Sequence, residues 1–216
     1  MKKKSSAKKI VLIGMLAAIA YIMVFLIRIP VVVFLKYEPK DVIITIGGFL
    51  MGPLAAFFIS LTVSLVEMLT ISDTGPIGAL MNLLSSCAFA CTAALIYKRR
   101  HTLGGAVLGL GVASVVTVVV MLLWNWLITP LYMGQPREAV EALLLPAFLP
   151  FNLLKAGLNS ALVLLLYKPL VSALRKTRLA DTPAAKPGSS KIGIYLLGAG
   201  LLATCILLLL VLKGKI

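Results

Sequence analysis

Residues 146–159 read Pro-Ala-Phe-Leu-Pro-Phe-Asn-Leu-Leu-Lys-Ala-Gly-Leu-Asn, an apolar run that two polar side chains interrupt near its middle. An ammonium group near the centre of a membrane span costs about 3 kcal/mol on insertion scales, so such groups usually face a bundle interior, a water-filled cavity or a ligand. Asn152, Lys155 and Asn159 are three and four residues apart and therefore share one helix face. The stretch predicts a membrane helix whose polar face points at a polar partner.

The composition indicates an integral membrane protein. Of the 216 residues, 61% are hydrophobic, and the mean hydropathy is +1.07. The formal net charge of +14 comes from basic residues gathered in short segments between apolar stretches. This pattern is typical of membrane topology rather than of nucleic-acid binding. We therefore predict an all-α, multi-pass protein of the cell (plasma) membrane.

The first span follows a strongly basic start. Residues 1–9 carry five lysines, and Arg28-Ile29-Pro30, not a small-residue cleavage site, follows the apolar stretch. We expect an uncleaved first helix with a cytoplasmic N-terminus. Clear candidates for spans are residues 10–28, 77–97, 103–127, 146–167 and 192–212.

Residues 39–71 can form one span or two helices broken at Gly52-Pro53. The break places fourteen loop Lys and Arg residues inside and six outside, whereas a single span places eight inside and twelve outside. The positive-inside rule therefore favours two helices, residues 39–51 and 53–70. The first would be only about 20 Å long, so we expect it to be tilted or buried within protein.

These segments predict a six-helix substrate-binding bundle over residues 10–178, with outer loops at 29–38, 71–76 and 128–145. Residues 179–191 are rich in Pro, Ala, Gly and Ser, as in a linker. A seventh transmembrane helix and a tail occupy 192–216. Lys213 and Lys215 would lie outside, against the positive-inside rule, so the orientation of this helix stays open.

Several polar residues lie inside the predicted spans and lean toward the outer half of the bundle. Glu67 is either an interfacial carboxylate in contact with water or a site residue that supplies a counter-charge to Lys155 or an acceptor to a ligand. Trp124 and Asn125 end the fifth helix, where an indole is either an interfacial anchor or a cavity wall. The full embedded set besides Lys155 is Glu67, Asn82, Asn125, Asn152 and Asn159.

The first helix carries Gly14 and Ala18 at a small-x-x-x-small spacing, with Ala17 beside them. Such faces allow close helix approach in lipid. The face packs either against the chain's own helices or against a partner membrane subunit.

Enzymatic equipment is sparse. The sequence contains no phosphate-binding loop, no His-Glu-x-x-His and no serine nucleophile elbow, so we expect a non-enzyme without an ATPase of its own. His101, the single histidine, falls in a basic loop. Cys87, Cys91 and Cys205 lie in apolar segments without His or carboxylate partners, so we predict no metal site and no cofactor.

Four segments, in this order, resemble the riboflavin-binding S component of energy-coupling-factor (ECF) vitamin transporters. The resemblance runs over residues 8–178 and includes the short second helix. The segments are Leu-Lys-Tyr-Glu-Pro-Lys-Asp-Val at 35–42, Gly-Gly-Phe-Leu-Met-Gly-Pro-Leu-Ala at 47–55, Thr-Gly-Pro-Ile-Gly-Ala-Leu-Met-Asn at 74–82, and Phe-Asn-Leu-Leu-Lys at 151–155.

The resemblance implies a membrane subunit that captures riboflavin from the outer side and works with a transmembrane coupling (T) protein and two cytoplasmic ATPases. Asn152 and Lys155 would bond the polar edge of the isoalloxazine ring. Asn82 and the Thr74-Gly75 loop would lie near the ligand, and Tyr37 with the first outer loop would form a lid. The small-residue face of the first helix would dock on the coupling protein.

Two features depart from the family pattern: the seventh helix, and Glu38, where Asp would match better. The chemistry of the residues agrees with a flavin, because Lys155 and Asn152 supply donors while Asn82, Asn125 and Glu67 can bond hydroxyl groups. An S component for pantothenate or thiamine is an alternative. A small intramembrane enzyme acting on lipid or isoprenoid substrates is another, and it would need paired carboxylates or a histidine inside the bundle.

Overall fold

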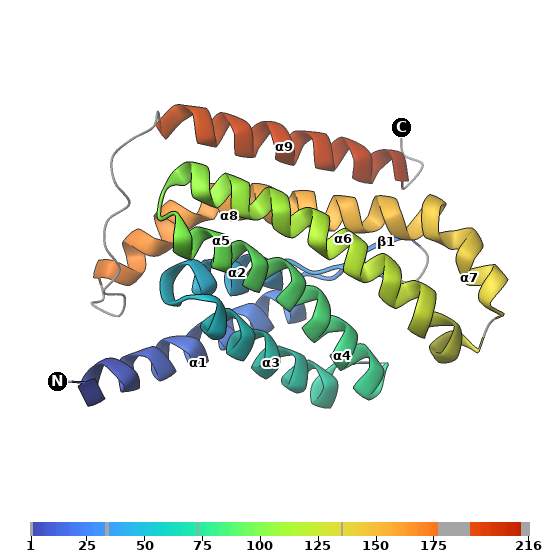
Figure 1. Cartoon of the computed structure of the whole chain (residues 1–216), viewed down its shortest axis with the longest axis horizontal. Coiled ribbons are helices and arrows are strands. Elements are labelled where there is room, and N and C mark those ends of the chain that lie inside the picture. Colours follow the sequence, from blue (N-terminus) through green and yellow to red (C-terminus); the bar gives the residue numbers. More distant parts are fainter. Residues whose placement is uncertain (1, 33–34, 73, 135, 177–190, 213–216) are drawn as a thin grey trace.

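The structure, a computed structural model, describes residues 2–32, 35–72, 74–134, 136–176 and 191–212. Almost all of this is helical (Figure 1). The elements are α1 (Lys2–Leu26), β1 (Ile29–Val32), β2 (Leu35–Tyr37), α2 (Lys40–Met51), α3 (Pro53–Thr70), α4 (Gly75–Ser86), α5 (Thr92–Arg99), α6 (Leu103–Met133), α7 (Arg137–Leu143), α8 (Leu149–Lys176) and α9 (Lys191–Leu212). Short π-helical segments, Cys87–Cys91 and Leu144–Phe148, join α4 to α5 and α7 to α8.

The helices confirm a multi-pass membrane fold. Within the described residues, five helical stretches are long and apolar enough to cross a bilayer, and a shorter apolar stretch lies in α9. The five are Ala7–Leu26, Pro53–Thr70, Gly75–Arg99, Leu103–Leu131 and Arg137–Leu170.

The predicted break at Gly52-Pro53 is confirmed, since α2 ends at Met51 and α3 begins at Pro53. Gly52 has φ +97°, a left-handed conformation that favours glycine, and Pro53 occupies the first turn of α3. The two residues turn the chain sharply enough for α2 to pack against α3.

Two predicted outer loops contain regular structure. Residues 29–32 and 35–37 pair as the antiparallel strands β1 and β2, called the hairpin below, and residues 128–145 are largely helix because α6 continues to Met133 and α7 begins at Arg137. Trp126 helps to fix α7, since its Nε1 donates to Glu141 Oε1 at 2.8 Å and its ring lies under the Arg137 guanidinium. The predicted linker falls outside the described residues except at Lys191, where α9 begins.

Helix α2 is the buried centre of the bundle. Eleven of its 12 residues are buried, so neighbouring protein rather than lipid surrounds this short helix. Close packing depends on Gly48: a Cβ there would stand 2.8 Å from Ala94 Cβ and 3.0 Å from Ala56 Cβ. Helix α2 is thereby wedged between α3 and α5.

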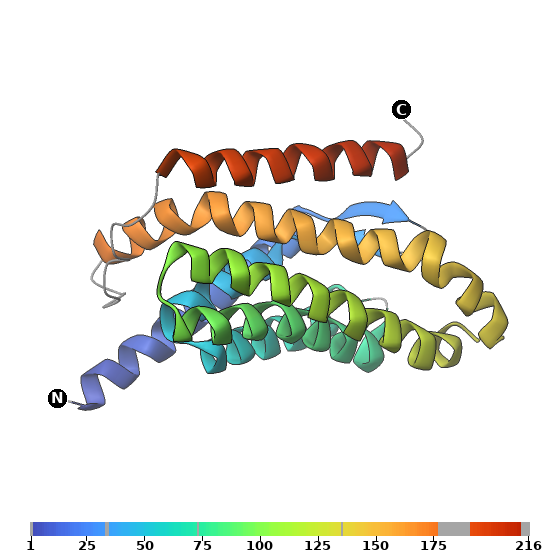
Figure 2. The same cartoon turned by 45° about the horizontal axis from the view of Figure 1, so that its top comes forward.

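Helix α9 lies alongside α8, on the side of the molecule away from α1 (Figures 1 and 2). A Cβ at Gly157 of α8 would stand 2.7 Å from Cys205 Sγ, so the glycine allows the two helices to approach closely. Cys205 shares an apolar cluster with Val31, Leu35 and Tyr37 of the hairpin. Helix α9 therefore packs against the hairpin.

We predict that Gly48→Leu lowers the melting temperature in detergent, because overpacking a well-filled core costs about 1–3 kcal/mol. The matched control is Gly111→Leu, since Gly111 is exposed within α6 and has open space at its Cβ position. Equal melting temperatures for the two variants would contradict the central packing role of Gly48.

Candidate binding site

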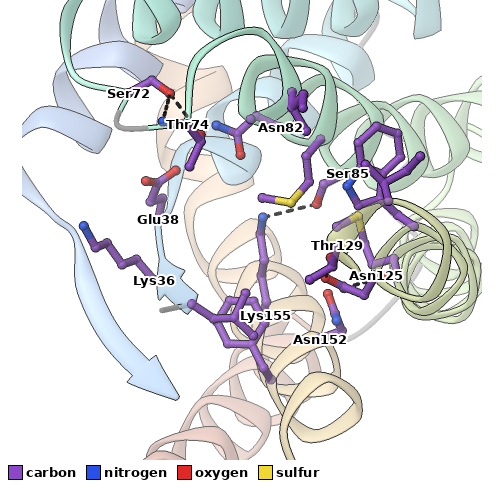
Figure 3. A pocket seen from close by; sticks show the side chains of 18 of the residues that line it. Lys36, Glu38, Ser72, Thr74, Asn82, Ser85, Asn125, Thr129, Asn152 and Lys155 are labelled. Atoms are coloured by element: carbon purple, nitrogen blue, oxygen red, sulfur yellow. Dashed lines mark hydrogen bonds between the residues drawn. The ribbon is translucent and has the colours of Figure 1, made fainter. Parts of the chain in front are cut away.

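A cavity of about 310 Å³ lies where the hairpin, the α3–α4 connection and the ends of α6 and α8 meet (Figure 3). Its polar walls are Arg28, Lys36, Glu38, Glu67, Ser72, Thr74, Asn82, Ser85, Asn125, Thr129, Asn152 and Lys155, and its remaining walls are Leu35, Ile77, Gly78, Met81, Met121, Trp124, Ile128 and Phe151.

The structure brings most of the residues singled out from the sequence to this cavity. Gly75 is not among the lining residues but begins α4 directly after Thr74, with φ +57°. Tyr37 does not line the cavity either; it is buried, and its hydroxyl donates to Asn159 Oδ1 at 3.1 Å. The predicted residues that line it are Glu67, Thr74, Asn82, Trp124, Asn125, Asn152 and Lys155.

The ammonium of Lys155 extends into the cavity (Figure 3) and has a counter-charge from α2. Its Nζ lies 3.3 Å from Asp41 Oδ2 and donates to Ser85 Oγ at 3.2 Å. Glu67 was a candidate for this counter-charge, and the structure assigns the position to Asp41 instead. The cost of an embedded lysine is thus offset within the chain itself.

Asp41 is a fully buried acceptor in the first turn of α2. Besides Lys155, it accepts from Ser86 Oγ and from Asn159 Nδ2, the latter at 3.2 Å. The N-terminal end of a helix also favours a negative charge. These groups account for a carboxylate that is only 1% exposed.

Glu67 is a buried side chain, 1% exposed, that is paired with Lys40. Lys40 Nζ lies 2.8 Å from Glu67 Oε1, 2.6 Å from its Oε2 and 3.0 Å from Glu38 Oε2. Asn82 Nδ2 also donates to Glu67 Oε2 at 2.8 Å, and Arg28 Nε donates to Glu38 Oε1 at 2.9 Å. The result is a continuous chain of alternating charges along one side of the cavity, and it corrects the interfacial interpretation of Glu67.

Lys40 and Asp41 were not predicted as site residues, although both fall in the first turn of the predicted helix at 39–51. Both are buried in the structure, at 0% and 1% exposure. The available signal was their position in the first turn of a helix too short and too apolar to lie in water.

The amide residues keep some of their hydrogen-bonding capacity. Asn152 Nδ2 donates to the carbonyl of Phe148 at 2.7 Å. An amide group has two donor hydrogens and an acceptor oxygen, so a donor and an acceptor of Asn152 remain for a ligand. Asn125 is held similarly, by Met121 O and by the hydroxyl of Thr129.

Two ionisable groups of the hairpin region have shifted pKa values. Burial raises the pKa of the Tyr37 phenol, and Asp41 and Cys205 act in the same direction, so Tyr37 stays a neutral donor. Burial alone would raise the pKa of Glu38, but the charges of Lys40 and Lys155 and hydrogen bonds from Lys40 and Arg28 outweigh it and lower that pKa.

The small-residue face of α1 divides between the interior and the surface. Ala17 packs inside the bundle, which reduces the predicted docking face to Gly14 and Ala18, both exposed. No atom lies within 4 Å of a Cβ built at Gly14.

Comparison with known proteins gives the family. The model of the family "ECF transporter, substrate-specific component" matches residues 8–167. This chain belongs to that family. The chain is therefore a substrate-binding subunit (S component) of a membrane transporter rather than an enzyme. Helix α9 lies beyond the matched residues.

Individual relatives agree with the family assignment. The riboflavin transporter RibU of Staphylococcus aureus (strain TCH60) is 28% identical over 178 residues, covering 78% of this S component and 93% of RibU. The riboflavin transporter FmnP of Bacillus subtilis (strain 168) is 23% identical over 185 residues, covering 80% and 97%. A solved S component of a bacterial ECF transporter superposes with a TM-score of 0.67 at 29% identity, covering 79% of this chain and 99% of that one.

The lowered pKa of Glu38 predicts a pH-dependent contribution to stability. Ionised Glu38 stabilises the fold fully above its ordinary value of 4.5, and this stabilisation is lost as the pH falls through the lower folded-state pKa. The melting temperature of Glu38→Gln should therefore lie below wild type at neutral pH, with a gap that narrows below pH 4.5. The exposed Glu138→Gln is the control and should show little gap throughout. A Glu38→Gln gap that is constant with pH would rule out this role.

Proposed function

We propose that this S component binds riboflavin in the 310 Å³ cavity from the outer side and delivers it inward together with a transmembrane coupling protein and two cytoplasmic ATPases. The observation that carries the proposal is a preformed cavity in which a charged donor, Lys155, and an amide, Asn152, line one part while carboxylates and amides line another. The names of two relatives, both riboflavin transporters, support the same ligand.

The cavity chemistry matches riboflavin at both ends of the molecule. Lys155 and Asn152 would donate to the carbonyl and ring-nitrogen acceptors along the edge of the isoalloxazine ring, between the apolar walls of Trp124 and Phe151. Glu67 and its neighbours would bond the ribityl hydroxyls. The other partners would be Asn82, the Thr74-Gly75 loop and, from α6, Asn125, and the hairpin would cover the ligand through Leu35 and Lys36, with Tyr37 buried behind them.

The topology supports an outward-facing cavity in the plasma membrane. The N-terminus, the α5–α6 connection and the end of α8 gather at one end of the bundle, on the left of Figure 1, and these segments carry most of the basic residues. The positive-inside rule assigns that end to the cytoplasm. On this basis residues 1–9 are cytoplasmic, residues 10–178 form the binding bundle, and 179–191 link it to the extra helix at 192–216.

A titration of the purified protein in detergent with riboflavin, followed by quenching of flavin fluorescence, tests the ligand. We predict saturable binding, and Lys155→Ala and Asn152→Ala should each weaken it about ten-fold, the effect of one lost buried hydrogen bond. Lys168→Ala is the control, because Lys168 lies near the other end of α8 beside Tyr195. Absence of binding at micromolar riboflavin would refute the proposal, and binding of pantothenate or thiamine instead would replace the ligand.

We predict that Gly14→Leu and Ala18→Leu reduce riboflavin uptake by cells while leaving binding by the purified protein unchanged. The reason is that a larger side chain on an exposed small-residue face prevents close approach of a partner helix. Ala203→Leu, on the exposed side of α9, is the matched control and should transport normally. Loss of binding in the α1 variants would show instead that this face serves internal packing.

A further inference from the structure

Two consecutive residues, Lys40 and Asp41, carry opposite charges in the first turn of α2, and neither lines the cavity. Both are buried, and their side chains bond different groups. Each forms ion pairs with charged residues that do line the cavity. Lys40 and Asp41 can therefore affect ligand binding without contacting the ligand.

Lys40 supports the acceptor groups of the cavity. Its ammonium lies within 3.0 Å of carboxyl oxygens of both Glu38 and Glu67, so one cation lies between the two acidic side chains. A carboxylate offers about four lone-pair sites. Glu67 uses three of them, two on Lys40 and one on Asn82, while Glu38 uses two, on Lys40 and Arg28. Both retain capacity to accept from ligand hydroxyls.

Asp41 supports the donor of the cavity. Its Oδ2 lies 3.3 Å from Lys155 Nζ, and Ser85 is the other group that this ammonium bonds. Without Asp41, the ammonium would lose its close counter-charge in a low-dielectric site. The position of the Lys155 ammonium therefore depends on Asp41, which is fixed by hydrogen bonds from Ser86 and Asn159.

We propose that Lys40 and Asp41 are paired positioning residues that set the orientation of the bound flavin, Lys40 through the acceptors for the ribityl chain and Asp41 through the donor for the ring edge. The inference rests on the proposed riboflavin function. Because the two residues are adjacent on one rigid, buried helix turn, the acceptor and donor groups keep a fixed separation. Only a ligand with ring acceptors and hydroxyls at matching distance satisfies both.

Two ligands separate the two roles: riboflavin, and lumiflavin, which has the same ring with a methyl group in place of the ribityl chain. Lys40→Gln should weaken riboflavin binding about ten-fold or more and change lumiflavin binding less than three-fold. Asp41→Asn should weaken both about ten-fold or more. Ser64→Ala is the control: Ser64 is buried one turn before Glu67, and its hydroxyl has no partner among the described residues.

Two double variants distinguish positioning from general damage to the fold. Asp41→Asn should add less than three-fold to the loss of lumiflavin affinity caused by Lys155→Ala, because it acts through that lysine. Lys40→Gln combined with Glu67→Gln removes both members of the closest ion pair and leaves Glu38 with Arg28, so no charge is stranded. This double variant should keep a near-normal melting temperature and show the riboflavin-selective loss.

The outcomes separate this inference from the proposed function. Wild-type protein that binds neither flavin overturns both. Wild-type protein that binds riboflavin but not lumiflavin, an equal loss for the two ligands in the Lys40 variants, or additive effects of Asp41→Asn and Lys155→Ala would each overturn the positioning role alone.

Discussion

The arrangement of the helices around the cavity depends on the burial of two opposite charges at the start of α2, a helix that is too short to span the bilayer. Lys40 and Asp41 lie in the first turn of α2, at 0% and 1% exposure. A buried ion is tolerated only when excellent geometry and further hydrogen bonds satisfy it. The chain meets this requirement with residues from α3, α4 and α8. The first turn of α2 therefore connects these three helices through ion pairs and hydrogen bonds.

The same constraint explains the position of α2 in the bundle. With 12 residues it would reach about 18 Å, so both of its ends must be satisfied by protein rather than by headgroups or water. Gly48 lets it approach α3 and α5, and the turn at Gly52-Pro53 folds α3 back against it. Burial of the helix and burial of its charges are therefore parts of one packing solution.

Local sequence patterns were sufficient to predict part of the fold and part of the candidate site. The membrane fold, the helix break and the cavity positions of Asn152 and Lys155 could be predicted, because each follows from hydropathy, charge counting or the cost of an embedded ammonium. The pairing of Asp41 with Lys155 could not, since it joins two distant segments and only tertiary packing brings them together. The hairpin was not predicted because a short segment that contains a proline, Pro30, has the sequence features of a loop. Edge strands nevertheless tolerate proline.

The charges around the cavity also balance, and this bears on how an empty S component can persist in a membrane. Among the described residues, Arg28, Lys40 and Lys155 form ion pairs with Glu38, Asp41 and Glu67, so three basic side chains face three acidic ones. The formal charges of the network therefore sum to zero, and Lys155 has its counter-charge in Asp41 without a ligand. A neutral ligand such as riboflavin would enter without changing this balance.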